Sequence, residues 1–265
     1  MKKITGYGLL VVFILISGFS LPVQASDNIL IAVASNLRFA MHEICQDFQE
    51  ENYSIQTKVS YGSSGNFFAQ ISQGAPFDIF FSADATYPEL LEKEGLTAKE
   101  PQRVYAVGKI VLWFPIESEV DSDTGLQAVT SPAVKKLAIA NPRHAPYGRA
   151  AEESLRYYGL WEKVEEKLIY GENVSQTAQF VHTGAADAGI VALSLAISPK
   201  MLDEGRYWVI PDESHGDIEQ IYVVLKRGEG KKSIRKFLDF IHGEKGGEIL
   251  SRYGFVIPGN GENRS

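Results

Sequence analysis

The stretch V-S-Y-G-S-S-G-N-F, residues 59–67, joins a strand pattern to a helix pattern through a Gly-Ser-Ser-Gly turn. β-Branched and aromatic side chains dominate residues 55–61 before the turn, and residues 67–73 after it predict a helix. Small polar residues at a helix start have two explanations. They cap the helix, or they hold an anion, because the first helical turn leaves backbone N–H groups without partners. The rest of the chain decides between these explanations.

Strand and helix patterns alternate on both sides of this stretch. Residues 28–34 predict a strand, and residues 37–48 carry apolar side chains at helical spacing. After the turn, residues 78–81 predict a short buried strand, and a helix at 87–94 ends at Gly95. This βαβα order predicts a parallel sheet with helices on both faces.

A second alternation lies between two long strand patterns, at residues 104–114 and 218–226. Within it we expect strands at 137–140, 167–170 and 188–192, and helices at 148–158 and 175–182. Two long strands that bracket a separate α/β block predict two lobes, between which the chain crosses twice. The alternative is a single open sheet with a large insertion.

The predicted division of the chain follows from these crossings. Lobe 1 comprises residues 26–108 and 222–265, and the last segment includes two helix patterns at 233–242 and 247–253. Lobe 2 comprises residues 109–221. A ligand is expected in the cleft, outside the carboxyl ends of the strands.

The first 25 residues predict a cleavable signal peptide. Lys2 and Lys3 precede an apolar run at 9–19, and Val23-Gln24-Ala25 offers small residues at the cleavage spacing. The apolar run is too short to span a bilayer. We therefore expect an exported, periplasmic protein.

The charge of the 265-residue chain limits the classes of partner it is expected to bind, and its cysteine content limits the disulfides it can form. Removing residues 1–25 leaves 24 basic and 33 acidic residues, a formal charge of −9. An acidic chain without a basic run argues against nucleic acid and against anionic membrane surfaces. The single cysteine, Cys45, cannot form an internal disulfide, and its helical position predicts a buried thiol.

Four predicted junctions between a strand and the next helix carry small polar residues. They are Ser35-Asn36, the Gly62–Asn66 turn, Ala145-Pro146-Tyr147-Gly148, and Asn173-Val174-Ser175. Helix starts that converge on one cleft form an anion site that needs no lysine or arginine. Glycines at 62, 65 and 148 would let the backbone approach the ligand. Taken singly, each junction is also explained as an ordinary helix cap.

Enzymatic signals are weak. Asp78 and Asp84 form a pair that fits a metal or acid–base role, although Asp84 also fits the N-cap of the next helix. The histidines show no metal-ligand spacing, and the chain has no HExxH, G-x-S-x-G or P-loop motif. We expect no enzymatic activity and no cofactor. The alternative from another class is an exported hydrolase or metal enzyme that uses Asp78, Asp84 and His144.

Several blocks of the sequence match one known family. They are residues 32–36, 61–65, 73–84, 141–148, 189–191 and 252–255. In this order, and over nearly all of the mature chain, they resemble the periplasmic molybdate-binding proteins of ABC importers. The resemblance implies a type II-like periplasmic-binding-protein fold with two crossing strands as hinge. It also implies a monomer that captures molybdate or tungstate and delivers it to a membrane permease.

The resemblance also implies a ligand set. Ser35 and Ser64 match the hydroxyl donors of the first lobe, and Tyr147 and Val174 match backbone N–H donors of the second. Many members carry a tyrosine donor where this chain has Ala192. We expect the Tyr147 phenol to replace that donor, with Asn36 as a further donor.

The expected donors also bear on which anion is bound. Phosphate keeps a proton near neutral pH and needs an acceptor, whereas molybdate, tungstate and sulfate are fully ionised. The Asn36 amide oxygen offers one acceptor, which weakens the exclusion of phosphate. A sulfate-type or other small-oxyanion receptor therefore remains the alternative.

Overall fold

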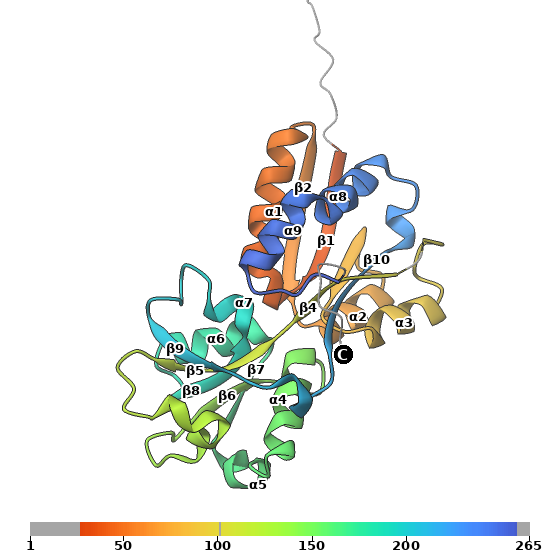
Figure 1. Cartoon of the computed structure of the whole chain (residues 1–265). Helices are drawn as coiled ribbons and strands as arrows, with labels where there is room; N and C mark the ends of the chain where they lie inside the picture. Colours follow the sequence, from red (N-terminus) through yellow and green to blue (C-terminus); the bar gives the residue numbers. More distant parts are fainter. Residues whose placement is uncertain (1–26, 101, 259–265) are drawn as a thin grey trace, which may run out of the picture.

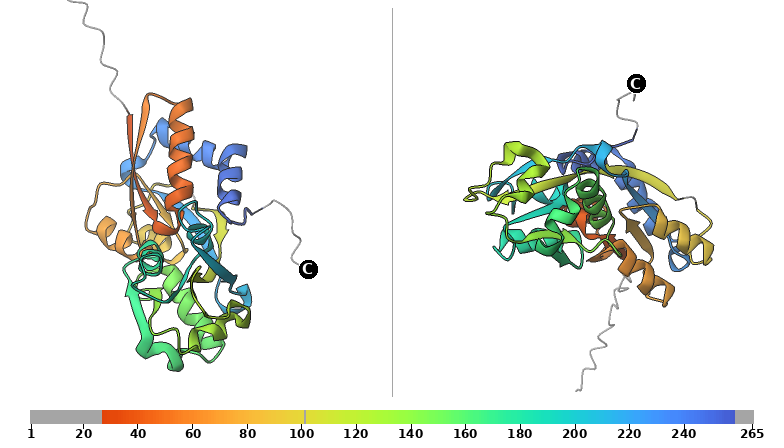
Figure 2. Two further views of the ribbon diagram at one scale, coloured as in Figure 1. Left: turned by 90° about the vertical axis from the view of Figure 1, so that its left-hand side faces the viewer. Right: turned by 90° about the horizontal axis from the view of Figure 1, so that it is seen from below.

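The computed structural model describes residues 27–100 and 102–258, and Figures 1 and 2 show two lobes with helices against each sheet. The predicted signal peptide lies outside the described residues. Each lobe holds one five-stranded sheet. The predicted α/β fold with two lobes is confirmed.

The sheet of lobe 1 has the strand order β2-β1-β3-β10-β4. Its strands are β1 (Asp27–Ala34), β2 (Ile55–Gly62), β3 (Ile79–Ser82), β4 (Arg103–Gly108) and β10 (Ile218–Val224). Strand β1 runs parallel to β2 and β3, whereas β10 is antiparallel to β3 and β4. Its helices are α1 (Arg38–Glu51), α2 (Ser64–Ser72), α3 (Thr86–Lys93), α8 (Lys232–His242) and α9 (Glu244–Arg252), with the 3₁₀ turns η1 (Ser35–Leu37) and η5 (Lys226–Gly228).

The helices of lobe 1 bury the apolar stripe that the sequence predicts. On α1, Met41, Ile44 and Phe48 are buried, and the Phe48 ring meets Phe237 of α8 edge to face at 5.1 Å. Cys45 lies on the same stripe, and its burial raises the pKa of the thiol to about 11. The predicted buried thiol is confirmed.

The sheet of lobe 2 repeats the plan of lobe 1, in the order β7-β6-β8-β5-β9. Its strands are β5 (Ile110–Pro115), β6 (Leu137–Ala140), β7 (Leu168–Gly171), β8 (Ala188–Ala192) and β9 (Gly205–Val209). Strand β6 is parallel to β7 and β8, and β5 is antiparallel to β8 and β9. Its helices are α4 (Pro146–Tyr157), α5 (Trp161–Val164), α6 (Val174–His182) and α7 (Leu193–Ala196), with the 3₁₀ segments η2 (Ser122–Thr130), η3 (Glu165–Lys167) and η4 (Asp212–Ser214).

The lobes are joined at two crossings, which Figure 1 shows between the sheets. The predicted strand at 104–114 is two strands, because β4 ends in the first sheet and β5 begins in the second, with Lys109 between them. The second crossing leads from β9 into β10. Ile218 already pairs with Gly108, so residues 218–221, which the predicted division assigned to lobe 2, lie in the sheet of lobe 1.

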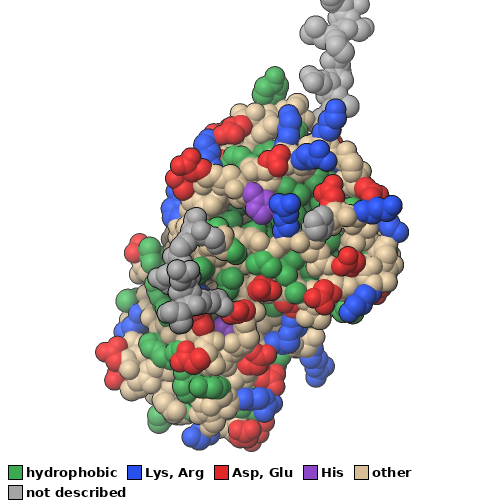
Figure 3. Space-filling model, turned by 45° about the vertical axis from the view of Figure 1, so that its right-hand side comes forward, with side chains coloured by type: hydrophobic (Ala, Val, Ile, Leu, Met, Phe, Trp, Pro, Cys, Tyr) green, Lys and Arg blue, Asp and Glu red, His purple; other side chains and the backbone are tan. Residues whose placement is uncertain are grey.

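The distribution of surface charge and the lengths of the helices are relevant to contacts with charged partners and with membranes. On the face drawn in Figure 3, acidic and basic side chains are intermixed rather than gathered by sign. Among the described residues, no helix is long and apolar enough to cross a membrane.

Candidate functional site

Four chain segments from both lobes converge where the lobes meet. In lobe 1, β1 leads into η1 and β2 into α2; in lobe 2, residues after β6 lead into α4 and residues after β7 into α6. All four segments, together with Ala83 after β3, line one small cavity. Its lining residues are Ala34, Ser35, Asn36, Gly62, Ser63, Ser64, Ala83, Ala145, Pro146, Tyr147, Asn173 and Val174.

The structure brings all five predicted site residues together around this cavity: Ser35, Asn36, Ser64, Tyr147 and Val174. Each of the five is at least 97% buried. The volume of the cavity is about 10 Å³, room for one small occupant. The cavity therefore suits a compact ion rather than an organic ligand.

The hydroxyls of Ser35 and Ser64 are oriented by backbone donors. The Ala83 N–H donates to Ser64 Oγ at 3.0 Å, and the Ser175 N–H donates to Ser35 Oγ at 3.3 Å. Neither hydroxyl donates its own proton to another described residue, so both protons are available to an anion in the cavity.

Backbone N–H groups supply further donors. Ser64 and Val174 are the first residues of α2 and α6, and Tyr147 is the second residue of α4. Their N–H groups therefore lack a helical acceptor, and no other acceptor from the described part of the chain contacts them. The three helix dipoles add partial positive charge at the same point.

The starts of these helices differ from the predicted ones. Helix α2 begins at Ser64 rather than at residue 67, because Ser63 is its N-cap and accepts the Asn66 N–H at 3.4 Å. Ser64 is thus a helical residue with both its hydroxyl and its N–H at the cavity. Each explanation of the Gly-Ser-Ser-Gly turn therefore applies to one of its two serines. Ser63 caps helix α2, and Ser64 presents its hydroxyl and N–H to the cavity.

The glycines near the cavity serve protein packing. A Cβ on Gly148 would lie 2.2 Å from the Ala140 carbonyl oxygen, where α4 approaches β6. A Cβ on Gly65 would lie 2.8 Å from the carbonyl oxygen of His144 in the other lobe. Gly65 and Gly148 therefore permit close packing within the protein, whereas Gly62 lies in the cavity lining.

The Tyr147 phenol lies on the hinge side of the cavity. A Cβ on Gly108, at the end of β4, would be 2.1 Å from the phenol oxygen. The Tyr147 hydroxyl and the Asn36 Oδ1 are both buried without a partner in hydrogen-bonding geometry, and Asn36 Nδ2 donates to Gln220 Oε1 at 2.8 Å. Burial raises the pKa of Tyr147, a rise that the neighbouring Asn36 amide partly offsets, so the phenol stays protonated.

The lobes also bond directly to one another around the cavity. The Gly65 N–H donates to the His144 carbonyl at 2.9 Å, and Ser63 Oγ lies 3.0 Å from His144 Nδ1. Ser194, two residues past the vacant tyrosine position at Ala192, donates to the Asn36 carbonyl at 2.7 Å. The structure is therefore a closed arrangement of the two lobes.

Further interlobe bonds have no signal in the sequence. The Ser175 hydroxyl donates to the Ser35 carbonyl at 2.8 Å, and Arg149 of α4 forms an ion pair with Asp84 of lobe 1. No local signal distinguishes such residues from ordinary helix residues, because their partners lie in the other lobe.

The carboxylates that suggested an enzyme are engaged in structure. Asp78 is fully buried and contacts Arg227 at 2.5 Å and Lys231 at 2.8 Å. Asp84 pairs with Arg149 and accepts the Tyr87 N–H at 3.4 Å, although the N-cap of α3 is Ala85 rather than Asp84. In the described part of the chain, no group of three acidic, histidine or cysteine residues is placed to hold a metal ion.

Two similar lobes that close on a small cavity without charged side chains define a two-lobe binding protein. The family model described as bacterial extracellular solute-binding protein matches residues 29–256. The chain belongs to this family.

Similar proteins and a similar solved structure are named as molybdate-binding proteins. The molybdate-binding protein ModA of Azotobacter vinelandii is 38% identical over 88% of this chain and 91% of its own length. ModA of Rhodobacter capsulatus is also 38% identical, over 91% of this chain and 93% of its own. The solved structure of the A. vinelandii periplasmic molybdate-binding protein has a TM-score of 0.81 at 31% identity, covering 87% of this chain and 99% of that chain. The predicted resemblance to molybdate-binding proteins is confirmed.

Proposed function

We propose that this protein captures molybdate or tungstate in the cavity between its lobes and delivers the ion to the permease of an ABC importer. It acts in the periplasm as a monomer and catalyses no reaction. One observation carries the proposal: hydroxyl and backbone donors from both lobes meet around a cavity whose lining includes no charged side chain. The names of the close relatives support the same ligand.

The donor set supports the proposed preference for a fully ionised dianion over phosphate. Ser35 and Ser64 donate their hydroxyl protons, and the N–H groups of Ser64, Tyr147 and Val174 donate from the helix starts. These groups stabilise a fully ionised dianion without a countercharge. Among the described lining residues, Asn36 Oδ1 and the Tyr147 hydroxyl are buried side-chain acceptors without a partner, and neither is a carboxylate, so a protonated phosphate finds no strong acceptor for its proton.

Calorimetric titration of the mature protein with molybdate, tungstate, sulfate and phosphate tests the proposal. We expect binding at submicromolar concentration for the first two only. Perchlorate serves as a control, because it is tetrahedral but carries a single charge. Tight sulfate binding would show a sulfate-type receptor and overturn the proposed ligand.

The Tyr147 phenol has its own test. Tyr147→Phe keeps the backbone N–H and removes only a buried hydroxyl without a partner. If the phenol replaces the donor missing at Ala192, the binding free energy of molybdate weakens by about 1.5 to 3 kcal/mol, the range for a hydrogen bond to a charged group.

A matched control is Tyr105→Phe, because the Tyr105 hydroxyl is also buried and without a partner but lies outside the cavity lining. We expect this variant to keep the parent affinity. Equal affinities for both variants and the parent would restrict the phenol to packing against Gly108.

A further inference from the structure

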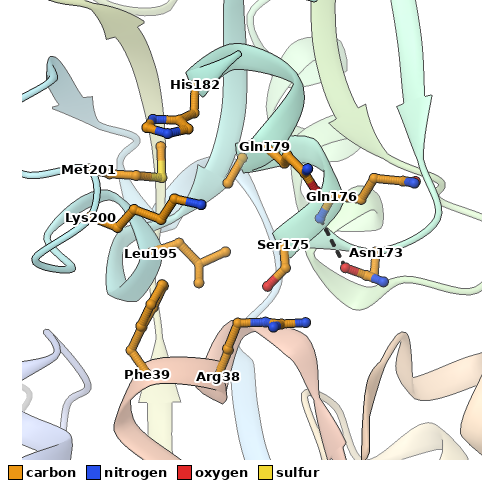
Figure 4. Close-up of a pocket in the computed structure, with 11 residues that line it drawn as sticks. Arg38, Phe39, Asn173, Ser175, Gln176, Gln179, His182, Leu195, Lys200 and Met201 are labelled. Atoms are coloured by element: carbon orange, nitrogen blue, oxygen red, sulfur yellow. Dashed lines mark hydrogen bonds between the residues drawn. The ribbon is translucent and has the colours of Figure 1, made fainter. Parts of the chain in front are cut away.

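A second, larger cavity of about 310 Å³ lies beside the first, between the lobes. Helix α1 of lobe 1 forms one side, and α6, α7 and the segment after α7 form the other (Figure 4). Its lining residues are Arg38, Phe39, Asn173, Ser175, Gln176, Ala178, Gln179, His182, Leu195, Lys200 and Met201.

Two cations from opposite lobes line this cavity, and the guanidinium carbon of Arg38 also lies over the Tyr61 ring, 5.0 Å from the ring centroid. Figure 4 shows the Lys200 side chain reaching into it from lobe 2, with the Arg38 side chain extending from α1. No carboxylate within the described ranges lies at ion-pair distance from either cation, and the lining includes no Asp or Glu. The lining side chains themselves thus carry two cations and no carboxylate, while Glu204 lies just outside the lining and contacts His182 at 2.8 Å.

The other lining residues suit an organic ligand. Leu195 and Met201 are buried and form an apolar surface with half-buried Phe39, and Figure 4 shows these side chains beside Lys200. Gln179 adds an amide at the rim. Seven of the eleven lining residues are polar or charged and four are apolar, so the cavity suits a charged ligand with a small apolar part. Its volume lies at the lower end of the range for small-molecule sites.

The second cavity adjoins the first, and the two are connected by a shared lining residue and by hydrogen bonds. Asn173 lines both cavities, and the Ser175 backbone and hydroxyl bond to Ser35 of the first cavity. A ligand that touches both Arg38 and Lys200 contacts both lobes. Such a ligand binds the closed arrangement of the lobes better than an open one, because opening moves the two sides of the cavity apart.

We propose that this cavity is a second binding site, for a small organic anion with two carboxylates on an aromatic or branched apolar body. The carboxylates pair with Arg38 and Lys200, and the apolar body rests on Phe39, Leu195 and Met201. Occupation of the site favours closure and thereby strengthens oxyanion capture in the first cavity.

Titration with phthalate in the absence of any oxyanion tests the site directly. We expect phthalate to bind, succinate to bind at least about tenfold more weakly because it lacks the ring, and benzyl alcohol not to bind. Absence of phthalate binding overturns the proposal. Equal affinities for phthalate and succinate overturn the apolar part of it.

Charge-removing variants localise the binding. Lys200→Gln and Arg38→Gln should each weaken phthalate binding about tenfold or more. The matched controls Lys236→Gln and Arg235→Gln change exposed residues of α8, outside the cavity, and should keep the parent affinity. Equal losses in all four variants would indicate nonspecific attraction and overturn the site.

The coupling to the first cavity rests on the proposed function and has a separate readout. With saturating molybdate present, phthalate should bind several-fold more tightly, and phthalate should tighten molybdate binding by the same factor. Unchanged or weaker binding overturns the coupling. The oxyanion-free titration does not depend on molybdate, so failure of the second site and failure of the proposed function are distinguishable.

Discussion

The double variant Ser35→Ala, Ser64→Ala is expected to bind molybdate about 10² to 10⁴ times more weakly than the parent protein. Each serine has its oxygen occupied by a backbone N–H and its proton directed to no other described residue. A hydrogen bond to a charged group contributes about 1.5–3 kcal/mol, so losing two costs about 3–6 kcal/mol. Since 1.4 kcal/mol is tenfold in affinity, the loss spans two to four orders of magnitude.

Calorimetry with molybdate measures this loss, and thermal unfolding without ligand checks that the variant folds. A matched control is Ser154→Ala, Ser214→Ala, which removes two buried hydroxyls that contact each other at 2.8 Å in lobe 2, away from the cavity lining. The control should keep the parent affinity. A double variant of Ser35 and Ser64 that binds molybdate as tightly as the parent would rule out both hydroxyls as ligand donors.

Asp78→Ala is expected to lower the free energy of unfolding by about 3 kcal/mol. The carboxylate is fully buried, accepts the Leu30 N–H at 2.8 Å and contacts both Arg227 and Lys231. Removing it leaves that N–H and two cations without their partner at the edge of the lobe 1 core. Both cations are partly exposed, which places the expected loss at the low end of the range for buried pairs.

Urea unfolding followed by circular dichroism measures this effect. Asp78→Asn keeps an acceptor for Leu30 and should lose less than Asp78→Ala. Asp212→Asn is the control, because the Asp212 side chain is 57% exposed in its pair with Lys109, and such surface pairs contribute about 0–1 kcal/mol. Similar losses for Asp78→Ala and Asp212→Asn would contradict a structural role for the buried carboxylate.

The sequence predicts most of the fold because hydrophobic periodicity and turn residues mark its elements. Strands β6 and β8 have the predicted bounds, and the alternation of strands and helices identifies both lobes. The predicted division places the lobe boundary between residues 108 and 109, but the end of one strand at this point is not predicted, because apolar and β-branched residues flank Lys109 on both sides. Only the pairing of β4 and β5 with different sheets shows where one strand ends.

The candidate site was predicted only in part, because some of its features have local sequence signals and others do not. Helix starts at strand ends have local signals, so the four junctions could be identified from the sequence alone. The choice of Ser35, Ser64, Tyr147 and Val174 within them came from the family resemblance. The partners that orient them, such as Ala83 and Ser175, bond across turns and between lobes. Those contacts depend on how the lobes close, which local sequence patterns do not encode.

The strand orders of the two sheets match, so a two-fold operation relates the plan of one lobe to that of the other. Neighbouring strands β1 and β2 lead two segments to the first cavity from one lobe, and the corresponding strands β6 and β7 lead two from the other. A tetrahedral ion has the same symmetry, with two pairs of oxygens related by a two-fold axis. A planar anion such as nitrate has three oxygens, and one of the four segments would face no oxygen. The duplicated architecture therefore selects for the shape of the ion as well as for its charge.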